Sequence, residues 1–114
     1  MSDCLFCKIV AGQIPAKLLA ESEHAVAFAD INPVAPTHLL VIPRKHLHAF
    51  AEATAADAQV LGDVMLLAAR VAKEKGLEAA GYRLVSNTGS DAGQSVAHLH
   101  VHVLGGRKLA WPPG

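Results

Sequence analysis

Two stretches of the chain carry apolar residues at helical spacing. The shorter one, 4–11, ends before Gly12. The longer one, 54–75, begins at Thr54, a residue type that caps helix N-termini, and is followed by Gly76. Glycine is a common residue just beyond a helix end. We therefore expect one short N-terminal helix and one long helix that ends at Gly76.

Short segments with β-rich composition or apolar–polar alternation surround the long helix. Such segments, bounded by proline, glycine and asparagine, predict strands. The chain has 114 residues, of which 52% are hydrophobic, which suits one compact domain spanning 1–114. We expect an α+β fold whose five-stranded antiparallel sheet has helices packed on one side. The predicted strands lie around 18–20, 24–30, 37–42, 82–86 and 98–104.

The last of these strands alternates histidine with apolar residues. Side chains of a β-strand point alternately to the two faces of the sheet. His98, His100 and His102 should therefore share one face and lie close together. Imidazole can act as base, acid, nucleophile or metal ligand near neutral pH. A catalytic or metal-binding cluster is thus a better interpretation than a solvated strand face.

A glycine-containing loop precedes the histidines. Gly93-Gln94-Ser95 ends three residues before His98. Successive backbone amides and a hydroxyl group can form an anion-binding concavity, and glycine lets a ligand approach the backbone closely. The same residues would also suit an ordinary polar turn. An anion site beside a histidine cluster is the combination that phosphoryl transfer requires.

Composition limits the partners that we expect. Ten basic and ten acidic residues cancel, so there is no broad basic surface for nucleic acid or for a membrane. We find no signal peptide and no apolar run long enough to span a bilayer, and we expect a cytoplasmic protein. The two cysteines, Cys4 and Cys7, then indicate metal binding or redox chemistry more than a structural disulfide.

The segment His98-Leu99-His100-Val101-His102-Val103-Leu104 resembles the signature of the histidine triad (HIT) superfamily. Further segments spread over nearly the whole chain resemble its nucleotide-binding (HINT) branch. These segments are Phe28-Ala29-Asp30-Ile31, Pro36-Thr37-His38, Val41-Ile42-Pro43, Gly81-Tyr82-Arg83-Leu84, Gly93-Gln94-Ser95 and Trp111-Pro112-Pro113-Gly114.

The resemblance implies a HIT-like fold and a homodimeric purine nucleoside phosphoramidase acting on amine conjugates of AMP and GMP. It implies that His100 is the nucleophile. Because the attacking nitrogen must be neutral, we expect Nδ1 to face phosphorus while a backbone carbonyl holds the proton on the other nitrogen. His102 would contact the phosphate and help to protonate the leaving group. His98 would bond to nearby backbone, and His38 would be a further active-site histidine.

The resemblance also implies a set of nucleotide-binding residues. Ser95 would donate to a phosphate oxygen or the leaving nitrogen, and Asp30 would accept from the ribose hydroxyls, although Asp30 also suits a strand-end turn. Plain core packing is the alternative for the apolar residues of the set. Asn87, Gly93 and Gln94 match phosphate or ribose positions; Phe6, Ile9, Phe28 and Ile31 match the base pocket; and Trp111 lies in a tail that reaches the active site of the partner subunit.

Some histidine triad proteins complete a zinc site from a Cys-x-x-Cys pair. By this resemblance the ligands would be Cys4, Cys7, His46 and His98, a composition suited to structural zinc. The alternative is a pair of reduced, metal-free cysteines. No cofactor is expected to be required for catalysis. His24 and His48 match no role, and we expect them to face solvent.

Three other functions stay open on the sequence. One is hydrolysis of dinucleoside polyphosphates, a second activity within the superfamily. Another is a nucleotide-binding adaptor with incidental hydrolysis. The last is a zinc enzyme in which all three triad histidines hold a catalytic metal ion.

Overall fold

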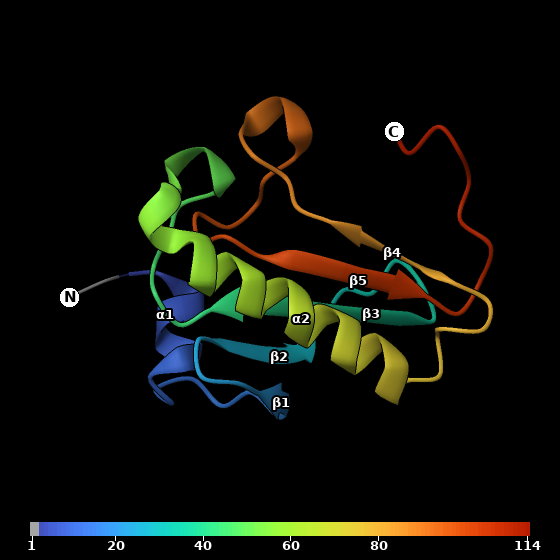
Figure 1. Ribbon diagram of the computed structural model, residues 1–114, viewed down its shortest axis with the longest axis horizontal. Coiled ribbons are helices and arrows are strands. Elements are labelled where there is room, and N and C mark those ends of the chain that lie inside the picture. The colour runs from blue at the N-terminus through green and yellow to red at the C-terminus, as the bar shows by residue number, and fades with distance from the viewer. Residues whose placement is uncertain (1–2) are drawn as a thin grey trace.

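The computed structural model describes residues 3–114, in which five strands form one antiparallel sheet of order β1-β2-β3-β5-β4 (Figure 1). One long and one short α-helix accompany it, as predicted. The helices are α1 (Leu5–Val10) and α2 (Ala58–Glu74), and the strands are β1 (Leu18–Glu21), β2 (Ala25–Ala29), β3 (Thr37–Pro43), β4 (Tyr82–Val85) and β5 (Val101–Gly105). Three short 3₁₀ turns complete the chain: η1 (Phe50–Glu52), η2 (Ala55–Asp57) and η3 (Ser90–Ala92).

The two α-helices pack on opposite faces of the sheet, so the prediction that they share one face is wrong. On one face α2 contributes buried Val64 and Leu67 to a core with Leu39 and Val41. The opposite face is covered in part by Phe6 of α1, which packs against other side chains of β2 and β3. Both alternating sets of β3 are apolar and buried, and a strand that is apolar on both faces needs cover on both.

The start of α2 is tied to the segment that follows β3. Thr54 caps this turn as predicted, because its hydroxyl accepts a hydrogen bond from the backbone N–H of Ala56. In the same turn, a carboxylate oxygen of Asp57 accepts a hydrogen bond from the backbone N–H of Thr54, at 3.0 Å. The other oxygen of Asp57 lies 2.6 Å from Nζ of Lys45. This ion pair positions the stretch of chain next to His46.

The strand that carries the histidines is shorter than predicted. β5 begins at Val101, so His98 and His100 precede it. The backbone there bonds to neighbouring loops instead of a strand ladder: the N–H of Leu99 donates to the carbonyl of Leu47 at 2.6 Å, and the hydroxyl of Ser86 donates to the carbonyl of His100 at 2.9 Å. His98 and His100 are nevertheless buried.

The alternation itself holds across this boundary. Val101 and Val103 belong to the core under α2. The rings of His98 and His100 lie on the α1 side, with centroids 5.9 and 5.3 Å from that of Phe6. The ring of His102 follows, 5.0 Å from that of His100. The three imidazoles therefore form the predicted cluster on one side of the chain.

None of the helices within residues 3–114 is long and apolar enough to cross a membrane.

Candidate active site

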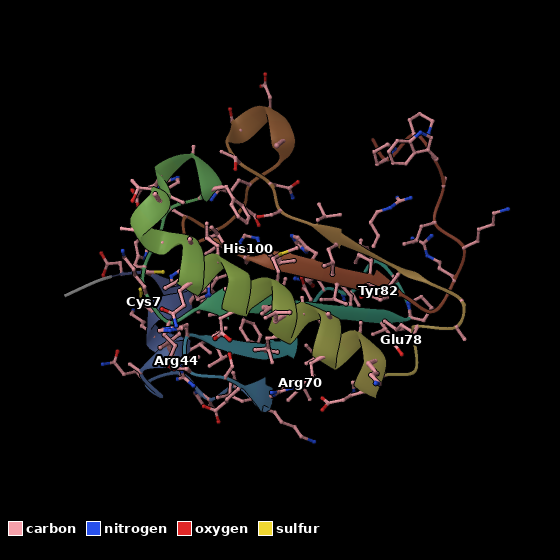
Figure 2. The ribbon with its side chains drawn as sticks, viewed as in Figure 1. Cys7, Arg44, Arg70, Glu78, Tyr82 and His100 are labelled. Carbon is pink, nitrogen blue, oxygen red and sulfur yellow. The ribbon has the colours of Figure 1, made fainter. Side chains whose placement is uncertain are left out.

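A pocket of about 610 Å³ opens on the α1 side of the sheet, where α1 leaves part of that face uncovered. His100 and His102 contribute to its wall, and Figure 2 shows His100 at the start of β5. Most of the lining is apolar, and a few polar groups join it. This is the composition of a small-molecule site. Eight of the residues expected at a nucleotide site line it: Phe6, Ile9, Phe28, Asp30, Ile31, Ser95, His100 and His102.

Part of the pocket wall comes from a segment that the sequence did not single out. The stretch 14–17 connects α1 to β1 without regular structure, so no periodicity in it indicates a role. It reaches the pocket because β1 pairs with β2. Leu18, the first residue of β1, is paired with Phe28 of β2, and Phe28 lines the pocket. The lining residues not predicted are Leu5, Ile14, Pro15, Ala16, Lys17, Ala29, Asn32, Leu40 and Val96.

The hydrogen bond of the His100 ring defines its tautomer. Nδ1 lies 2.8 Å from the carbonyl oxygen of His98. A carbonyl can only accept, so Nδ1 carries the proton and donates. The lone pair of the neutral ring is then on Nε2, the nitrogen left for the pocket. The expectation that Nδ1 would face a phosphorus atom is therefore wrong, although a backbone carbonyl does hold the proton, as predicted.

A chain of three hydrogen bonding groups defines the tautomer of His102. The backbone N–H of Val34 donates to Nδ1 of His38 at 3.1 Å, so the proton of neutral His38 is on Nε2. That nitrogen lies 2.8 Å from Nδ1 of His102, which must accept, and 3.3 Å from a carboxylate oxygen of Asp30. Neutral His102 therefore carries its proton on Nε2, as a donor.

His102 is also difficult to charge. Burial, the largest cause, lowers the pKa of His102 to about 4 together with the neighbouring His100 and His38. The nearby carboxylate of Asp30 opposes this shift only in part. An imidazolium at His102 near neutral pH, which the sequence suggested as a proton source, is thus disfavoured in the unliganded protein. The pocket instead presents an Nε2 lone pair on His100 beside an Nε2–H on His102.

The two carboxylate oxygens of Asp30 have different partners. One carboxylate oxygen accepts from the backbone N–H of Asn32 at 2.8 Å, which makes the turn after β2. The other oxygen is the one near His38. Asp30 also lines the pocket, so a carboxylate is available there for a polar part of a ligand.

The glycine-containing loop is held together by the side chain of Gln94. Its amide donates to the carbonyls of His48 and Val96 at 2.7 and 3.1 Å, and its oxygen accepts from the N–H of Gly89 at 2.9 Å. The Gln94 amide is thus occupied within the protein, and the loop reaches the pocket through Ser95. Two other residues predicted to contact phosphate or ribose, Asn87 and Gly93, do not line the pocket, and neither does Gln94.

The cysteines and two histidines meet behind the pocket. His98 Nδ1 lies 3.3 Å from Sγ of Cys4, 3.5 Å from Sγ of Cys7 and 3.2 Å from Nδ1 of His46. Nδ1 of His46 is 3.1 Å from Sγ of Cys7. Tetrahedral zinc would hold nitrogen ligands about 3.3 Å apart and a nitrogen and a sulfur about 3.6 Å apart. The four donor atoms are therefore already near the spacing that zinc requires.

The two ring nitrogens of His98 face different partners, so its position is compatible with each of the two roles that the sequence indicated for it. Its Nε2 lies 2.9 Å from the carbonyl oxygen of Pro43 and must donate to it, which leaves the Nδ1 lone pair facing the cysteines. Burial is the main reason why the pKa of His98 is lowered. The hydrogen bond to the carbonyl of Pro43 opposes this shift, whereas the nearby His46 and His100 add to it. A neutral ring is the form that binds metal.

The three triad histidines do not converge on one point. Nδ1 of His98 faces the cysteines, and Nδ1 of His100 faces a backbone carbonyl. Nδ1 of His102 faces His38. Within residues 3–114 no group of close donor atoms contains all three. The geometry contradicts the alternative of a catalytic zinc ion held by the triad.

Three further residues lie away from the pocket. Trp111 is 80% exposed, and the guanidinium of Arg83 lies 5.8 Å from its ring centroid. Figure 1 shows the C-terminal tail running along the β4 side of the sheet, away from α1. His48 is exposed as expected. His24 is half-buried, contrary to expectation, and its backbone N–H donates to Asp63 of α2 at 2.8 Å.

The chain belongs to the HIT domain family, whose model matches residues 11–109. An uncharacterised HIT-like protein of Synechococcus elongatus is 47% identical over 112 residues, which are 98% of this chain and 97% of that protein. A HIT family hydrolase from Legionella pneumophila has a similar structure, with a TM-score of 0.95 at 47% identity over 98% of this chain and 100% of the other. A histidine triad nucleotide-binding protein from Candida albicans gives a TM-score of 0.83 at 30% identity, over 96% and 83% of the two chains.

We predict that His102 stays neutral, with its proton on Nε2, well below pH 6. Nitrogen-15 NMR of the imidazoles should show a midpoint near 4 for His102. Because the unfolded chain takes up this proton near pH 6.5 and the folded chain only near 4, His102 also makes the folded state less stable as pH falls through that window. A midpoint near 6.5 in the folded protein would contradict the assignment.

Proposed function

We propose that the protein is a purine nucleoside phosphoramidase that hydrolyses the P–N bond of amine conjugates of AMP and GMP. The observation that carries this proposal is the pair of nitrogen atoms at one side of the pocket. His100 offers a lone pair on Nε2, because its Nδ1 donates to the carbonyl of His98. His102 beside it offers an Nε2–H, because its Nδ1 accepts from His38. A nucleophile next to a hydrogen bond donor suits attack on a phosphorus atom.

The remainder of the pocket suits a nucleoside. The rings of Phe6 and Phe28 pack edge to face, with centroids 5.6 Å apart, and Ile9 extends their apolar surface. A purine base would bury its apolar faces there. The carboxylate of Asp30 would accept hydrogen bonds from the ribose hydroxyls. This arrangement would place the α-phosphate beside His100. It is also supported by the similarity to a nucleotide-binding HIT protein.

In the first step, Nε2 of His100 attacks the α-phosphorus and a P–N bond to the ring forms. The bond between phosphorus and the substrate nitrogen breaks, and its electron pair stays on the departing amine. The ring becomes a cation that keeps its Nδ1–H, and the carbonyl of His98 stabilises the charge. The Nε2–H of His102 donates to a phosphate oxygen, which stabilises the negative charge there.

The departing amine needs a proton as the bond breaks. Since the pKa of His102 is lowered to about 4, we assign the transfer to the hydroxyl of Ser95, which lines the pocket and would take a proton from solvent as it gives one up. Water then attacks the phosphorus of the nucleotidyl-histidine, and its proton leaves by the same route in reverse. A P–O bond forms, and the bond between phosphorus and Nε2 of His100 breaks and returns its electron pair to the ring. The products are the free amine and the nucleoside monophosphate, and His100 is neutral again.

We predict that His100→Ala lowers turnover of an AMP-amide by about a thousandfold or more while AMP binding is retained, because the variant lacks the nucleophile but keeps the apolar pocket. Steady-state kinetics and calorimetric titration with AMP measure the two effects. Quenching the wild type in alkali during turnover, which preserves the P–N bond to imidazole that acid would cleave, should trap nucleotidyl-protein modified at His100. His24→Ala removes a histidine outside the pocket and is the matched control, with near-normal turnover. Substantial turnover in His100→Ala would exclude the proposed nucleophile.

We also propose that Cys4, Cys7, His46 and His98 bind a structural zinc ion. The support is the spacing of the four donor atoms and the lone pair that His98 directs toward them. Four protein ligands leave zinc no open coordination position, so the ion would supply cross-linking and no Lewis-acid chemistry. It would join α1 to the segments after β3 and before β5, and through His98 it would hold the residue whose carbonyl orients His100.

For the zinc site we predict about one zinc ion per chain in protein purified without chelators, measured by elemental analysis. Cys7→Ser removes one thiolate ligand and should lower the zinc content to a small fraction and lower the melting temperature. His48→Ala, an exposed histidine near the site, is the control and should leave both unchanged. A zinc content near zero in the wild-type protein, after growth with added zinc, would end this proposal.

We further propose a homodimer in which the β4 edges of two sheets meet. Among the strands of residues 3–114, β4 pairs only with β5, so the other side of β4 offers backbone groups outside any strand ladder of that part of the chain. The C-terminal tail is attached at this strand, where Arg83 donates to the carbonyl of Ala110 at 2.9 Å. In such a dimer each tail would lie beside the other subunit, and Trp111 could reach the pocket there.

The dimer proposal predicts a particle of two chains at micromolar concentration, measured by analytical ultracentrifugation. Trp111→Ala should leave this mass unchanged, because the strand edges make the contact, and should weaken turnover of an AMP-amide. A single-chain mass for the wild-type protein at these concentrations would contradict the proposal.

A further inference from the structure

A second cavity, of about 480 Å³, adjoins the nucleotide-sized pocket. The two cavities share Leu5, Ser95 and Val96 in their walls, so these residues form the boundary between them. The remaining lining of the second cavity comes from the N-terminus, from the segment after β3 and from the chain just before His98. These residues are Asp3, Cys4, His46, His48 and Ala97.

The position of this cavity suits the part of a substrate that departs. An in-line displacement places the leaving group on the side of the phosphorus away from the nucleophile. His100 lines the first pocket and does not line the second, whereas Ser95 lines both. A phosphorus atom held between His100 and Ser95 would therefore direct its leaving group across the boundary into the second cavity.

The charge of the cavity indicates which leaving groups it favours. Asp3 is the one carboxylate among the described residues that line it, and those residues include no lysine and no arginine. A zinc ion bound by two thiolates and two neutral imidazoles would add no net charge. A cation is therefore favoured here, and an anionic leaving group such as a nucleoside polyphosphate is disfavoured.

We propose that the second cavity is the subsite for the amine leaving group and that Asp3 selects amines that carry a further positive charge. This inference rests on the proposed phosphoramidase function and specifies its substrate class. Asp3 is a specificity-determining residue that would touch the far end of the leaving group. Because Asp3 is exposed, its contribution should be that of a surface ion pair, about two- to fivefold in affinity.

Equilibrium binding to the His100→Ala protein tests the inference without turnover. The probes are AMP conjugates of cadaverine, n-hexylamine and aminocaproic acid, whose chains match in length and end in an ammonium, a methyl and a carboxylate group. We expect the cadaverine conjugate to bind about two- to fivefold more tightly than the hexylamine conjugate, and the aminocaproate conjugate to bind most weakly. Asp3→Asn should remove these differences and leave the hexylamine conjugate unaffected.

The matched charge control is Glu78→Gln, which removes one exposed carboxylate at the opposite end of the molecule from Cys7 (Figure 2). It should leave the preference intact. A second variant, Ala97→Phe, places a large side chain in the cavity from an exposed position. It should weaken binding of all three conjugates while AMP, which needs only the first pocket, binds as before.

The outcomes separate this inference from the proposed function. If AMP binds and the wild type hydrolyses AMP-amides, but charge preference is absent or survives Asp3→Asn, the role of Asp3 is wrong and the phosphoramidase function stands. If Ala97→Phe weakens AMP and the conjugates equally, the second cavity is not the subsite. If AMP fails to bind and no AMP-amide is hydrolysed, the proposed function fails, and the inference about its leaving group fails with it.

Discussion

The hydrogen bond from Nδ1 of His100 to the carbonyl of His98 is the interaction on which the site depends. It determines which nitrogen of His100 is available to the pocket, and it would stabilise the cation that forms when that nitrogen reacts. The bond is well defined because His98 is itself held in two further directions, by the carbonyl of Pro43 and by the group of cysteines and His46. His98, which lines neither of the two cavities described above, thus determines which nitrogen of His100 carries the lone pair.

The pocket follows from unequal cover on the two faces of the sheet. α2 has 17 residues, a length of about 25 Å, and can cross the whole sheet, whereas the six residues of α1 span about 9 Å. Side chains of β2 and β3 are mostly apolar on both faces, so the face that α1 covers only in part supplies an apolar surface next to the histidines. That surface, bounded by the 14–17 segment, becomes the wall of the pocket.

Neutral imidazoles give the site its chemical character. Burial lowers the pKa values of His98 and His102, so these rings act through fixed lone pairs and N–H groups instead of positive charge. Each proton position follows from a partner that can only donate or only accept: the N–H of Val34, and the carbonyls of Pro43 and His98. Charge enters the two cavities through a few residues, among them Asp30 in the first and Asp3 in the second.

The sequence by itself determined the class of fold, the strands and helices to within a few residues, and the gathering of three imidazoles on one side of the chain. These properties are local, because periods of two and 3.6 residues and capping residues such as Thr54 act over short distances. Motif resemblance also indicated most polar residues of the pocket and the four donors behind it. The tertiary structure decided what depends on neighbours distant in the chain. It placed the helices on opposite faces, brought 14–17 into the wall, bonded the Gln94 amide to the distant carbonyl of His48 and selected Nε2 of His100. It also allowed His98 to contact the carbonyl of Pro43 and the cysteines at once, because the two nitrogen atoms of one ring face different partners.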